Sequence, residues 1–295
     1  MKAVIVILIL SLALSSSHAL YPAGSKVVMV RIDDIQDYAQ TSSYALAETT
    51  LLQYHIDHQV PALLAITASI FGKEPQLIDQ IRKGLDQEIF TLAIHGWNHV
   101  PYTQMSLSAQ ITDMDYAKNR LEAIFSVQIS AFVPPYSNFT DATIDAMKRN
   151  HLTLMSSATW VGDIPREEDG IVFIPETVTT ANVVTDSWAA VPFESIIQQI
   201  QDSWNNYGLA VVLIHPRQFT DEGYEERWNI YLRTIEWVQA TQGTIIRPEP
   251  PTPSTEYNLE PFSFSVGIVT GMASILIVVF GVAATRKKRQ RKTGE

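Results

Sequence analysis

The sequence predicts an α/β fold, a distorted or partial (β/α) barrel, and three observations support this class. Short β-branched or apolar runs recur along the chain, and segments with helical periodicity separate them. Repeated strand–helix units favour a mainly parallel sheet. Aspartate, histidine and tyrosine side chains follow several expected strands, and barrel enzymes carry their active sites at the carboxyl ends of their strands.

The first five elements follow from short local patterns. Lys26–Ile32 is a β-branched run and Val60–Thr67 is a longer apolar run, so both are expected to be strands. Between them, Ser42–His55 carries leucines at helical spacing, which indicates a helix. Pro75–Leu85 is expected to form the next helix, and Phe90–Ile94 the third strand.

The middle of the chain continues this alternation. Ser106 provides a hydroxyl group suited to cap the long amphipathic helix that is expected over Ser106–Phe125. Ala131–Val133 and Leu152–Ser156 are expected to be short strands. The segment Asp141–Asn150 lies between them and begins at a good capping position, so it is expected to be a helix.

The last four elements repeat the pattern once more. Glu194–Tyr207 is an expected helix that precedes the apolar strand Leu209–Ile214. The final helix is expected over Glu226–Gln242, and the final strand over Thr244–Arg247. The whole series predicts one large domain over residues 20–248.

Both ends of the chain are expected to lie outside this domain. Residues 1–19 combine a lysine, an apolar run and small residues before a cleavage site, as a secretory signal peptide does. Residues 249–264 are rich in proline and predict an extended stalk. Residues 265–284 carry no charge and are long enough for a transmembrane helix. The basic tail, residues 285–295, is expected to remain cytoplasmic.

This organisation predicts a single-pass type I protein of the cell membrane, with its catalytic domain outside the cytoplasm. The formal net charge is −10, and the predicted tail holds a cluster of basic residues, so the rest of the chain is more acidic still. Such a domain would repel phosphate backbones, which argues against nucleic acid as a partner. A polyanionic glycan is disfavoured for the same reason. The chain has no cysteine, so its fold needs no disulfide.

Paired aspartates and a His-x3-His pattern predict a metal site. His95 and His99 are four residues apart, so on a helical turn both imidazoles would reach one ion. With Asp34 as the third ligand, one coordination position stays open for water, as in catalytic zinc sites. Cobalt or another transition metal would also suit these ligands. Asp33 points away from Asp34 on an extended strand and would face the reacting water. Capping of a turn is the alternative for the aspartate pair.

The other four histidines of the predicted domain divide into one chemical candidate and three surface candidates. His215 follows an apolar strand and precedes Pro216. Histidine side chains titrate near neutral pH, so His215 is predicted to be the general acid, and a buried core histidine is the alternative. His55, His58 and His151 are interpreted as surface residues, because they fall in loops or at a helix end away from the strand ends.

These motifs resemble those of the polysaccharide deacetylase family, the NodB-homology or carbohydrate esterase family 4 type, from about Lys26 to Arg247. The resemblance implies a distorted (β/α) barrel of the NodB-homology type. It implies that Asp33 is the catalytic base. It also implies that Asp34, His95 and His99 hold one divalent metal ion, most often zinc.

Two further motifs extend the resemblance. The segment Pro134-Pro135-Tyr136 is similar to the end of the family's Arg-Pro-Pro-Tyr motif, whose tyrosine backbone N–H helps to bind the oxyanion. This match implies that role for Tyr136. The segment Leu213-Ile214-His215 is similar to the family's late Leu-x-His motif, which carries the general acid.

The chain departs from the family pattern at three places. Val133 stands where the family has an arginine that orients the catalytic aspartate, and Arg31, on the same strand face as Asp33, is the hypothetical replacement. Ser137 stands where the family has a glycine. The family's Asp/Trp motif has two candidates, Trp160 with Asp163 and Asp186 with Trp188. The short Arg-x-Asp-Asp form resembles that of divergent relatives.

The leading hypothesis is a metal-dependent deacetylase that hydrolyses N- or O-acetyl groups on a cell-surface or extracellular glycan. One alternative keeps the fold and the metal but acts on a non-glycan amide. Another is a catalytically decayed glycan-binding envelope protein, which the replacement at Val133 favours. The retained Asp33 and His215 argue against that second alternative, because a binding protein needs neither a base nor an acid.

Overall fold

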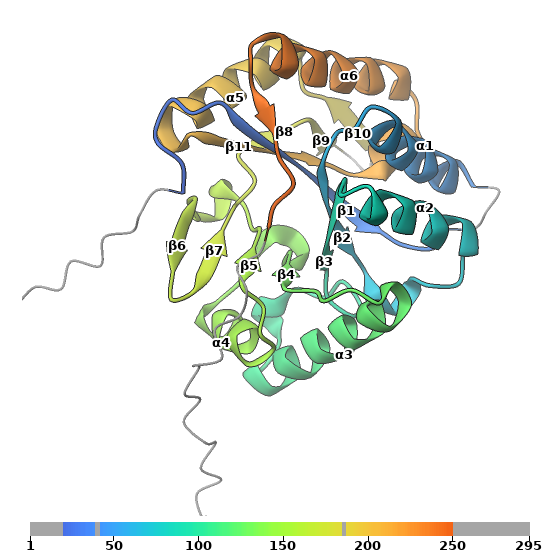
Figure 1. The fold of residues 1–295 in the computed structure, drawn as a ribbon, viewed down its shortest axis with the longest axis vertical. Coiled ribbons are helices and arrows are strands. Elements are labelled where there is room, and N and C mark those ends of the chain that lie inside the picture. Colours follow the sequence, from blue (N-terminus) through green and yellow to red (C-terminus); the bar gives the residue numbers. More distant parts are fainter. Residues whose placement is uncertain (1–19, 39–41, 185–186, 250–295) are drawn as a thin grey trace, which may run out of the picture. The chain divides into compact units, whose positions relative to one another are not determined.

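The computed structural model describes residues 20–38, 42–184 and 187–249 (Figure 1). All of them belong to the first of two compact units, Met1–Thr255. The predicted signal peptide, the transmembrane helix, the basic tail and all but the first residue of the predicted stalk lie outside the described residues. Among the described residues, no helix combines the length and the apolar character that a membrane crossing requires.

Most of the described strands form one ten-stranded sheet in the order β6-β7-β5-β4-β3-β2-β1-β11-β8, with β12 paired to β1. The pairs from β8 through β5 to β7 are parallel, and β6 is antiparallel to β7. The two ends of this order, β6 and β8, do not pair with each other, so the curled sheet is a partial barrel rather than a closed one. The predicted α/β partial barrel is confirmed. The strands of this sheet are β1 (Val27–Ile35), β2 (Ala62–Ile66), β3 (Phe90–Ile94), β4 (Ala131–Phe132), β5 (Leu154–Met155), β6 (Arg166–Glu168), β7 (Ile171–Phe173), β8 (Val178–Thr179), β11 (Leu209–Ile214) and β12 (Thr244–Ile245).

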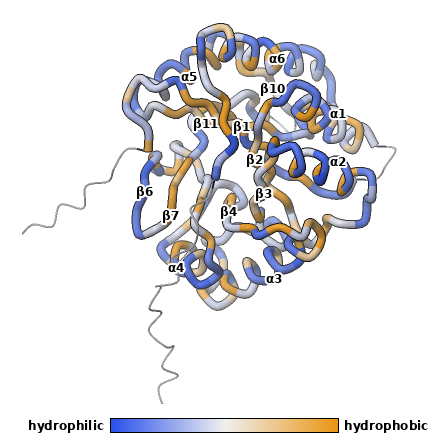
Figure 2. Tube along the Cα trace, in the orientation of Figure 1, coloured by the Kyte–Doolittle hydropathy of each residue, from blue (hydrophilic) through white to orange (hydrophobic). Residues whose placement is uncertain are grey.

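The helices surround the strands on the outside of the sheet (Figure 1). The predicted cap at Ser106 is present, since its hydroxyl group accepts a hydrogen bond from the N–H of Ala109. Ser42 caps α1 in the same way through the N–H of Ala45. Figure 2 shows hydrophilic residues on the outer turns of these helices and hydrophobic residues along the strands. The helices are α1 (Ser43–Asp57), α2 (Pro75–Asp86), α3 (Leu107–Phe125), α4 (Asp141–Arg149), α5 (Phe193–Tyr207) and α6 (Tyr224–Ala240).

Strand alternation separates two apolar cores. On β1, Val28, Val30 and Ile32 belong to the large core that includes residues of the surrounding helices. Met29 belongs to a smaller cluster, formed mostly by strand residues, that also contains Val133. Arg31 follows Met29 on the same strand face, so a charged side chain enters the inner side of the curled sheet.

Residues 157–192 contain strands that the sequence did not predict. The hairpin β6–β7 lies at one edge of the large sheet, and β8 is the strand at the other edge. Strands β9 (Ala181–Val184) and β10 (Ser187–Ala190) form a separate antiparallel pair. Each of these strands has only two to four residues. Such short segments are too brief to show the alternation on which strand prediction depends.

Candidate active site

The two aspartates lie near the carboxyl end of β1, where the strand is irregular. The pairing of β1 with β2 shifts register between Ile32 and Ile35, and the backbone of Asp34 has a φ angle of 61°. This left-handed conformation is uncommon for a residue other than glycine. It interrupts the strand alternation, and both Asp33 and Asp34 line one cavity. The expectation that their side chains point apart, which assumed a regular strand, is therefore wrong.

The two histidines of the His-x3-His pattern do not lie on a helical turn, contrary to the sequence-based expectation. His95 follows β3 directly, and the chain then forms a loop with φ angles of 71° at Gly96 and 55° at His99. A Cβ atom at Gly96 would meet Pro135 at 3.3 Å, so the loop also passes close to the next strand end. The loop nevertheless brings the imidazole centroids to 4.7 Å from each other.

Asp34, His95 and His99 form a candidate metal site. Their ligand atoms all lie within 4.8 Å of one another. The Oδ1 atom of Asp34 lies 3.5 Å from Nε2 of His95 and 3.2 Å from Nε2 of His99. Zinc–nitrogen and zinc–oxygen bonds of about 2.0–2.1 Å place two ligands of a tetrahedral ion roughly 3.3 Å apart. The donor set therefore fits a divalent cation of this kind.

The hydrogen bonds around His95 support the same assignment of atoms. Its Nδ1 atom lies 2.7 Å from the carbonyl oxygen of Val133. A carbonyl oxygen only accepts, so Nδ1 carries a proton, and Nε2 is the ring nitrogen that faces Asp34 and would bind the metal ion after losing its proton. The backbone of the strand-end residue Val133 thus fixes the ring orientation that metal binding requires.

The three side chains also perturb one another's ionisation. Burial acts to raise the pKa of Asp34, but the hydrogen bond with His95 and nearby imidazole charge outweigh it and hold that pKa well below its ordinary value. Burial and the neighbouring charge of His95 lower the pKa of His99. Burial acts to lower the pKa of His95, but its hydrogen bond with Asp34 and the two nearby carboxylates raise that pKa above its ordinary value. The ionised Asp34 and the readily deprotonated His99 are therefore in the forms that bind a metal ion, whereas His95 would release a proton on binding.

A buried arginine lies beside the other aspartate. The side chain of Arg31 is only 1% exposed, and its Nη2 donates to Oδ2 of Asp33 at 2.9 Å. Its Nη1 donates to the carbonyl oxygens of Ser156 at 2.9 Å and Ser157 at 2.6 Å. A second carboxylate, that of Glu176, lies 3.9 Å from Nη2. These contacts hold the guanidinium in one orientation.

The hydrogen bonding of Asp33 is incomplete. Its Oδ2 atom binds Arg31, while its Oδ1 atom is buried and has no hydrogen-bond partner within the protein. A buried carboxylate oxygen without a partner is costly, and water or a ligand commonly completes its hydrogen bonding. Since Asp33 lines the cavity, its Oδ1 atom is suited to accept a proton or a hydrogen bond from a molecule bound there.

His215 and Tyr136 reach the same cavity from two other strand ends. His215 follows β11 directly, and its ring lies against that of Trp188 on β10, with centroids 5.0 Å apart. Tyr136 lies in a 3₁₀ turn, Pro135–Ser137, after β4, with a φ angle of 59°. Its ring centroid is 4.7 Å from that of His99. Every residue that the sequence singled out for chemistry therefore lines one cavity.

That cavity has a volume of about 660 Å³. Sequence reasoning had not selected several of its polar lining residues, among them Glu176, Arg217 and Asn182. Glu176 and Asn182 fall in the stretch of very short strands, where no motif or periodicity marked them. Arg217 lies two residues after His215, so its proximity to that motif was the only signal for it. Trp160 and Trp188, each a member of one candidate Asp/Trp pair, both line the cavity, whereas Asp163 instead contacts Ser157 and Arg166.

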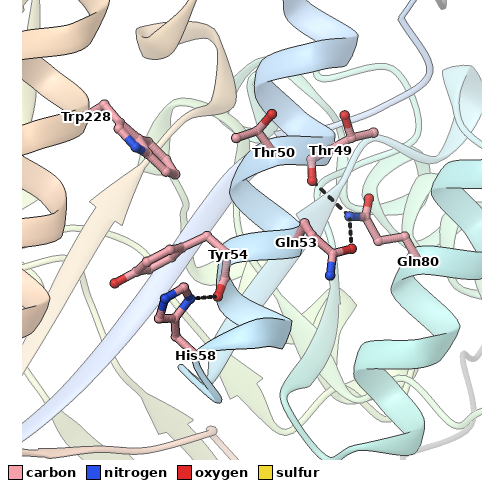
Figure 3. Close-up of a pocket in the computed structure, with 7 residues that line it drawn as sticks. All are labelled: Thr49, Thr50, Gln53, Tyr54, His58, Gln80 and Trp228. Atoms are coloured by element: carbon pink, nitrogen blue, oxygen red, sulfur yellow. Dashed lines mark hydrogen bonds between the residues drawn. The ribbon is translucent and has the colours of Figure 1, made fainter.

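A second cavity, of about 520 Å³, lies among α1, α2 and α6 and shares no lining residue with the first (Figure 3). Its polar groups largely bind one another, since Gln80 donates to the backbone of Thr49 and to Gln53, and His58 contacts the backbone of Tyr54 (Figure 3). It has no carboxylate and only one histidine among its lining residues. The candidate chemistry is concentrated in the first cavity.

One of the three histidines expected at the surface is buried instead. His55 is 0% exposed, and its ring contacts the carbonyl oxygen of Val60 at 2.8 Å and the hydroxyl of Tyr231 at 2.7 Å. The interpretation of His55 as a surface residue is wrong, because α6 packs over the end of α1 and covers it. His58 and His151 are exposed, as expected.

Comparison with known protein families gives a match over the first part of the domain. Residues 21–155 match the model of the family described as polysaccharide deacetylase. This range contains the two aspartates, the His-x3-His segment and Tyr136, whereas His215 lies beyond it. None of the curated proteins matches the sequence.

Several solved structures share the fold at low sequence identity. A polysaccharide deacetylase, described as putative, from Mycobacterium smegmatis is 14% identical, with a TM-score of 0.54 over 78% of this chain and 96% of that one. The catalytic domain of a peptidoglycan N-acetylglucosamine deacetylase from Eubacterium rectale is 17% identical, with a TM-score of 0.50 over 80% and 93%. A family 4 acetyl xylan esterase from Clostridium thermocellum, solved with cobalt, is 12% identical, with a TM-score of 0.50 over 75% and 88%. At these identities the matches show the fold alone.

Proposed function

The chain belongs to the polysaccharide deacetylase family, and on this premise we propose that it is a metal-dependent deacetylase acting on N- or O-acetyl groups of a cell-surface or extracellular glycan. The observation that carries the proposal is the convergence of three potential metal ligands, an incompletely bonded carboxylate and a histidine on one cavity. Metal-assisted hydrolysis of an amide or ester uses such a set of metal ligands, a general base and a general acid. The related deacetylases of peptidoglycan and xylan support the choice of an acetylated glycan.

Asp34, His95 and His99 would hold the metal ion. A divalent cation bound there would polarise the acetyl carbonyl group and lower the pKa of a water molecule. Three carboxylates (Asp33, Asp34 and Glu176) and two guanidinium groups (Arg31 and Arg217) line the cavity, so its formal charge is −1 with neutral imidazoles. This net negative charge favours a cation at the site.

Asp33 is the proposed general base. Arg31 fixes its Oδ2 atom, and the remaining Oδ1 atom faces no protein donor, so it can take a proton from the attacking water. A new bond forms between the water oxygen and the acetyl carbon. The backbone N–H of Tyr136 is the proposed donor to the tetrahedral oxyanion, and loss of one such donor typically costs about 10²–10³ in rate.

His215 is the proposed general acid. It lines the same cavity from β11, on the other side of β1 from the strand that carries His95. The carbon–nitrogen or carbon–oxygen bond breaks as His215 gives its proton to the leaving amine or alcohol, and acetate remains. Its partner in packing, Trp188, limits the positions that the imidazole ring can take.

The main argument for the alternative of a catalytically decayed glycan-binding protein was Val133, and the contacts of Arg31 weaken that argument. Val133, at the position of the family's arginine, is fully buried, and a guanidinium nevertheless contacts the proposed base, because Arg31 supplies it from β1. A non-glycan amide remains a second candidate substrate, since the cavity residues that contact the acetyl group would be the same.

We also propose that the domain acts outside the cytoplasm. The features that support this location are those of the sequence, namely the apolar start of residues 1–19 and the uncharged segment of residues 265–284 before a basic tail. Fractionation of cells that express the full chain, with protease added to intact cells, tests it. Protection of the domain from protease in intact cells would contradict the proposed orientation.

Metal analysis of the purified full-length protein tests the proposed function first. We expect close to one zinc or cobalt ion per chain, lost in the His95→Ala/His99→Ala double variant, and acetate release from an acetylated glycan only by the wild type. The exposed His58→Ala/His151→Ala variant is the matched control and should keep both properties. A wild type that binds no divalent metal after zinc addition would exclude this mechanism.

A further inference from the structure

The guanidinium of Arg227, on the first turn of α6, is buried although it does not line the cavity. The residue is 5% exposed. Its nitrogens donate to four backbone carbonyl groups, those of Gln218, Trp188, Glu222 and Asp221, and it forms an ion pair with the Asp221 carboxylate. A buried cation with this many partners holds together segments that are distant in the sequence.

One of these segments carries the indole ring that contacts His215. The carbonyl oxygen of Trp188 accepts from Nη1 of Arg227 at 2.7 Å, and the N–H of Trp188 donates to Oδ2 of Asp221 at 3.2 Å. Both backbone groups of Trp188 therefore bind one ion pair. The position of the indole, 5.0 Å from the His215 ring between centroids, depends on that pair.

The other segment is the turn that directly follows His215. Gln218 accepts a hydrogen bond from the N–H of His215 with its side-chain oxygen at 3.4 Å, and its own N–H donates to the carbonyl oxygen of His215 at 3.1 Å. The carbonyl oxygen of Gln218 in turn accepts from Nε of Arg227. The backbone of His215 and the ring against its imidazole are thus both connected to the same guanidinium.

We propose that Arg227 is a positioning residue for His215, which it holds in place through Trp188 on one side and Gln218 on the other. This inference rests on the proposed function, in which His215 protonates the leaving group. A guanidinium suits the task because its three nitrogens form a planar fork that reaches all these acceptors. A lysine in the same place keeps the charge but offers a single nitrogen. Misplacement of a catalytic group by about 1 Å can cost about 10² in rate.

The test compares two substrates that differ in their need for a general acid. Hydrolysis of an N-acetylglucosamine oligomer requires protonation of the leaving amine, whereas the nitrophenolate of 4-nitrophenyl acetate leaves without a proton. For Arg227→Lys in the full-length zinc-loaded protein, we expect kcat on the oligomer to fall by about 10²-fold. On the aryl ester we expect a fall of less than about threefold, with unchanged KM on both substrates and unchanged zinc content.

Two further variants guard against an effect on folding. Arg233→Lys changes another arginine of α6, one that lies over the Phe193 ring, and it should leave both activities as in the wild type. Asp221→Asn keeps the shape of the ion-pair partner and should show the same selective loss to a smaller degree. Equal losses on the two substrates in the Arg227 and Asp221 variants, loss of zinc, or no loss at all would overturn the positioning role.

A spectroscopic readout separates this inference from the proposed function. We expect Arg227→Lys to shift or broaden the NMR signals of the His215 imidazole and the Trp188 indole N–H, while those of the buried His55 stay unchanged. If the wild type hydrolyses neither substrate, the proposed function fails, and these signals still decide whether Arg227 positions His215. Unchanged His215 and Trp188 signals in the variant would overturn the inference.

Discussion

Arg31 and Asp33, two residues apart on β1, form a buried ion pair in which Nη2 of the arginine lies 2.9 Å from Oδ2 of the aspartate. Strand alternation places both side chains on the inner face of the curled sheet. The ion pair therefore forms within β1, whereas the family pattern places its arginine on a different strand from the aspartate. The pair leaves the other carboxylate oxygen free for a reacting molecule. A guanidinium thus contacts Asp33 although Val133 stands where the family pattern has an arginine.

Arg31→Lys is expected to lower kcat by about 10²-fold, because an ammonium group cannot reach Asp33 and the backbone carbonyls of Ser156 and Ser157 together. Metal content should stay unchanged, since Arg31 is not a ligand. The exposed Arg82→Lys, which removes a surface guanidinium beside Asp79, is the matched control and should have no effect. Steady-state kinetics with zinc analysis checks both, and full activity of Arg31→Lys would contradict the role of the pair.

Restoring the family's arginine at Val133 is expected to destabilise the protein. Val133 is fully buried in the smaller apolar cluster, which is formed mostly by strand residues. An unpaired guanidinium would add volume and buried charge, which together typically cost about 3–5 kcal/mol. We expect urea unfolding of Val133→Arg to show this loss, with Val133→Ile as the apolar control that loses less than about 2 kcal/mol. A stable Val133→Arg would show that the cluster can accommodate the charge.

His215→Ala and His99→Ala are expected to separate acid catalysis from metal binding. His215→Ala should keep its metal and lose about 10²–10⁴-fold in kcat, the usual contribution of a general acid. His99→Ala should lose metal affinity, because it removes one of three ligands. Zinc titration beside kinetics distinguishes the two, and loss of zinc in His215→Ala would make His215 a ligand instead.

Sequence reasoning predicted the parts of the molecule that depend on local pattern. The long helices and the buried parallel strands have apolar runs or clear periodicity, so Leu209–Ile214 and Phe90–Ile94 agree with the structure residue for residue. The strand ends then located the candidate site, since parallel strands finish at one edge of the sheet.

Features that depend on the approach of distant segments could not be predicted in this way. The loop from His95 to His99 takes its shape from two positive φ angles and from contact with Pro135, not from helical spacing. Glu176 and Asn182 belong to the region of very short strands, and their strand pairings give no periodicity that the sequence could show. The burial of His55 likewise arises from contact with Tyr231, which is 176 residues away in the sequence.

The buried His55 predicts an acid-dependent loss of stability. Burial lowers its pKa from 6.5 to about 4, so the folded protein holds it neutral while the unfolded chain takes up a proton below pH 6.5. Its contribution is therefore complete above pH 6.5 and is lost progressively as the pH falls towards 4. A shift of this size corresponds to about 3 kcal/mol in the free energy of unfolding.

Urea unfolding at pH 7 and at pH 4.5 gives the free energy of unfolding at each pH, and the difference between the wild type and His55→Gln measures the contribution of His55. We expect the wild type to lose roughly 2–3 kcal/mol more than His55→Gln between the two pH values, because glutamine does not titrate. His58→Gln, at the exposed end of the same helix, should follow the wild type. The metal ligands titrate equally in all three proteins, so their contribution cancels. A wild type and a His55→Gln variant with the same pH dependence would mean that the unfolded and folded chains hold this histidine in the same protonation state.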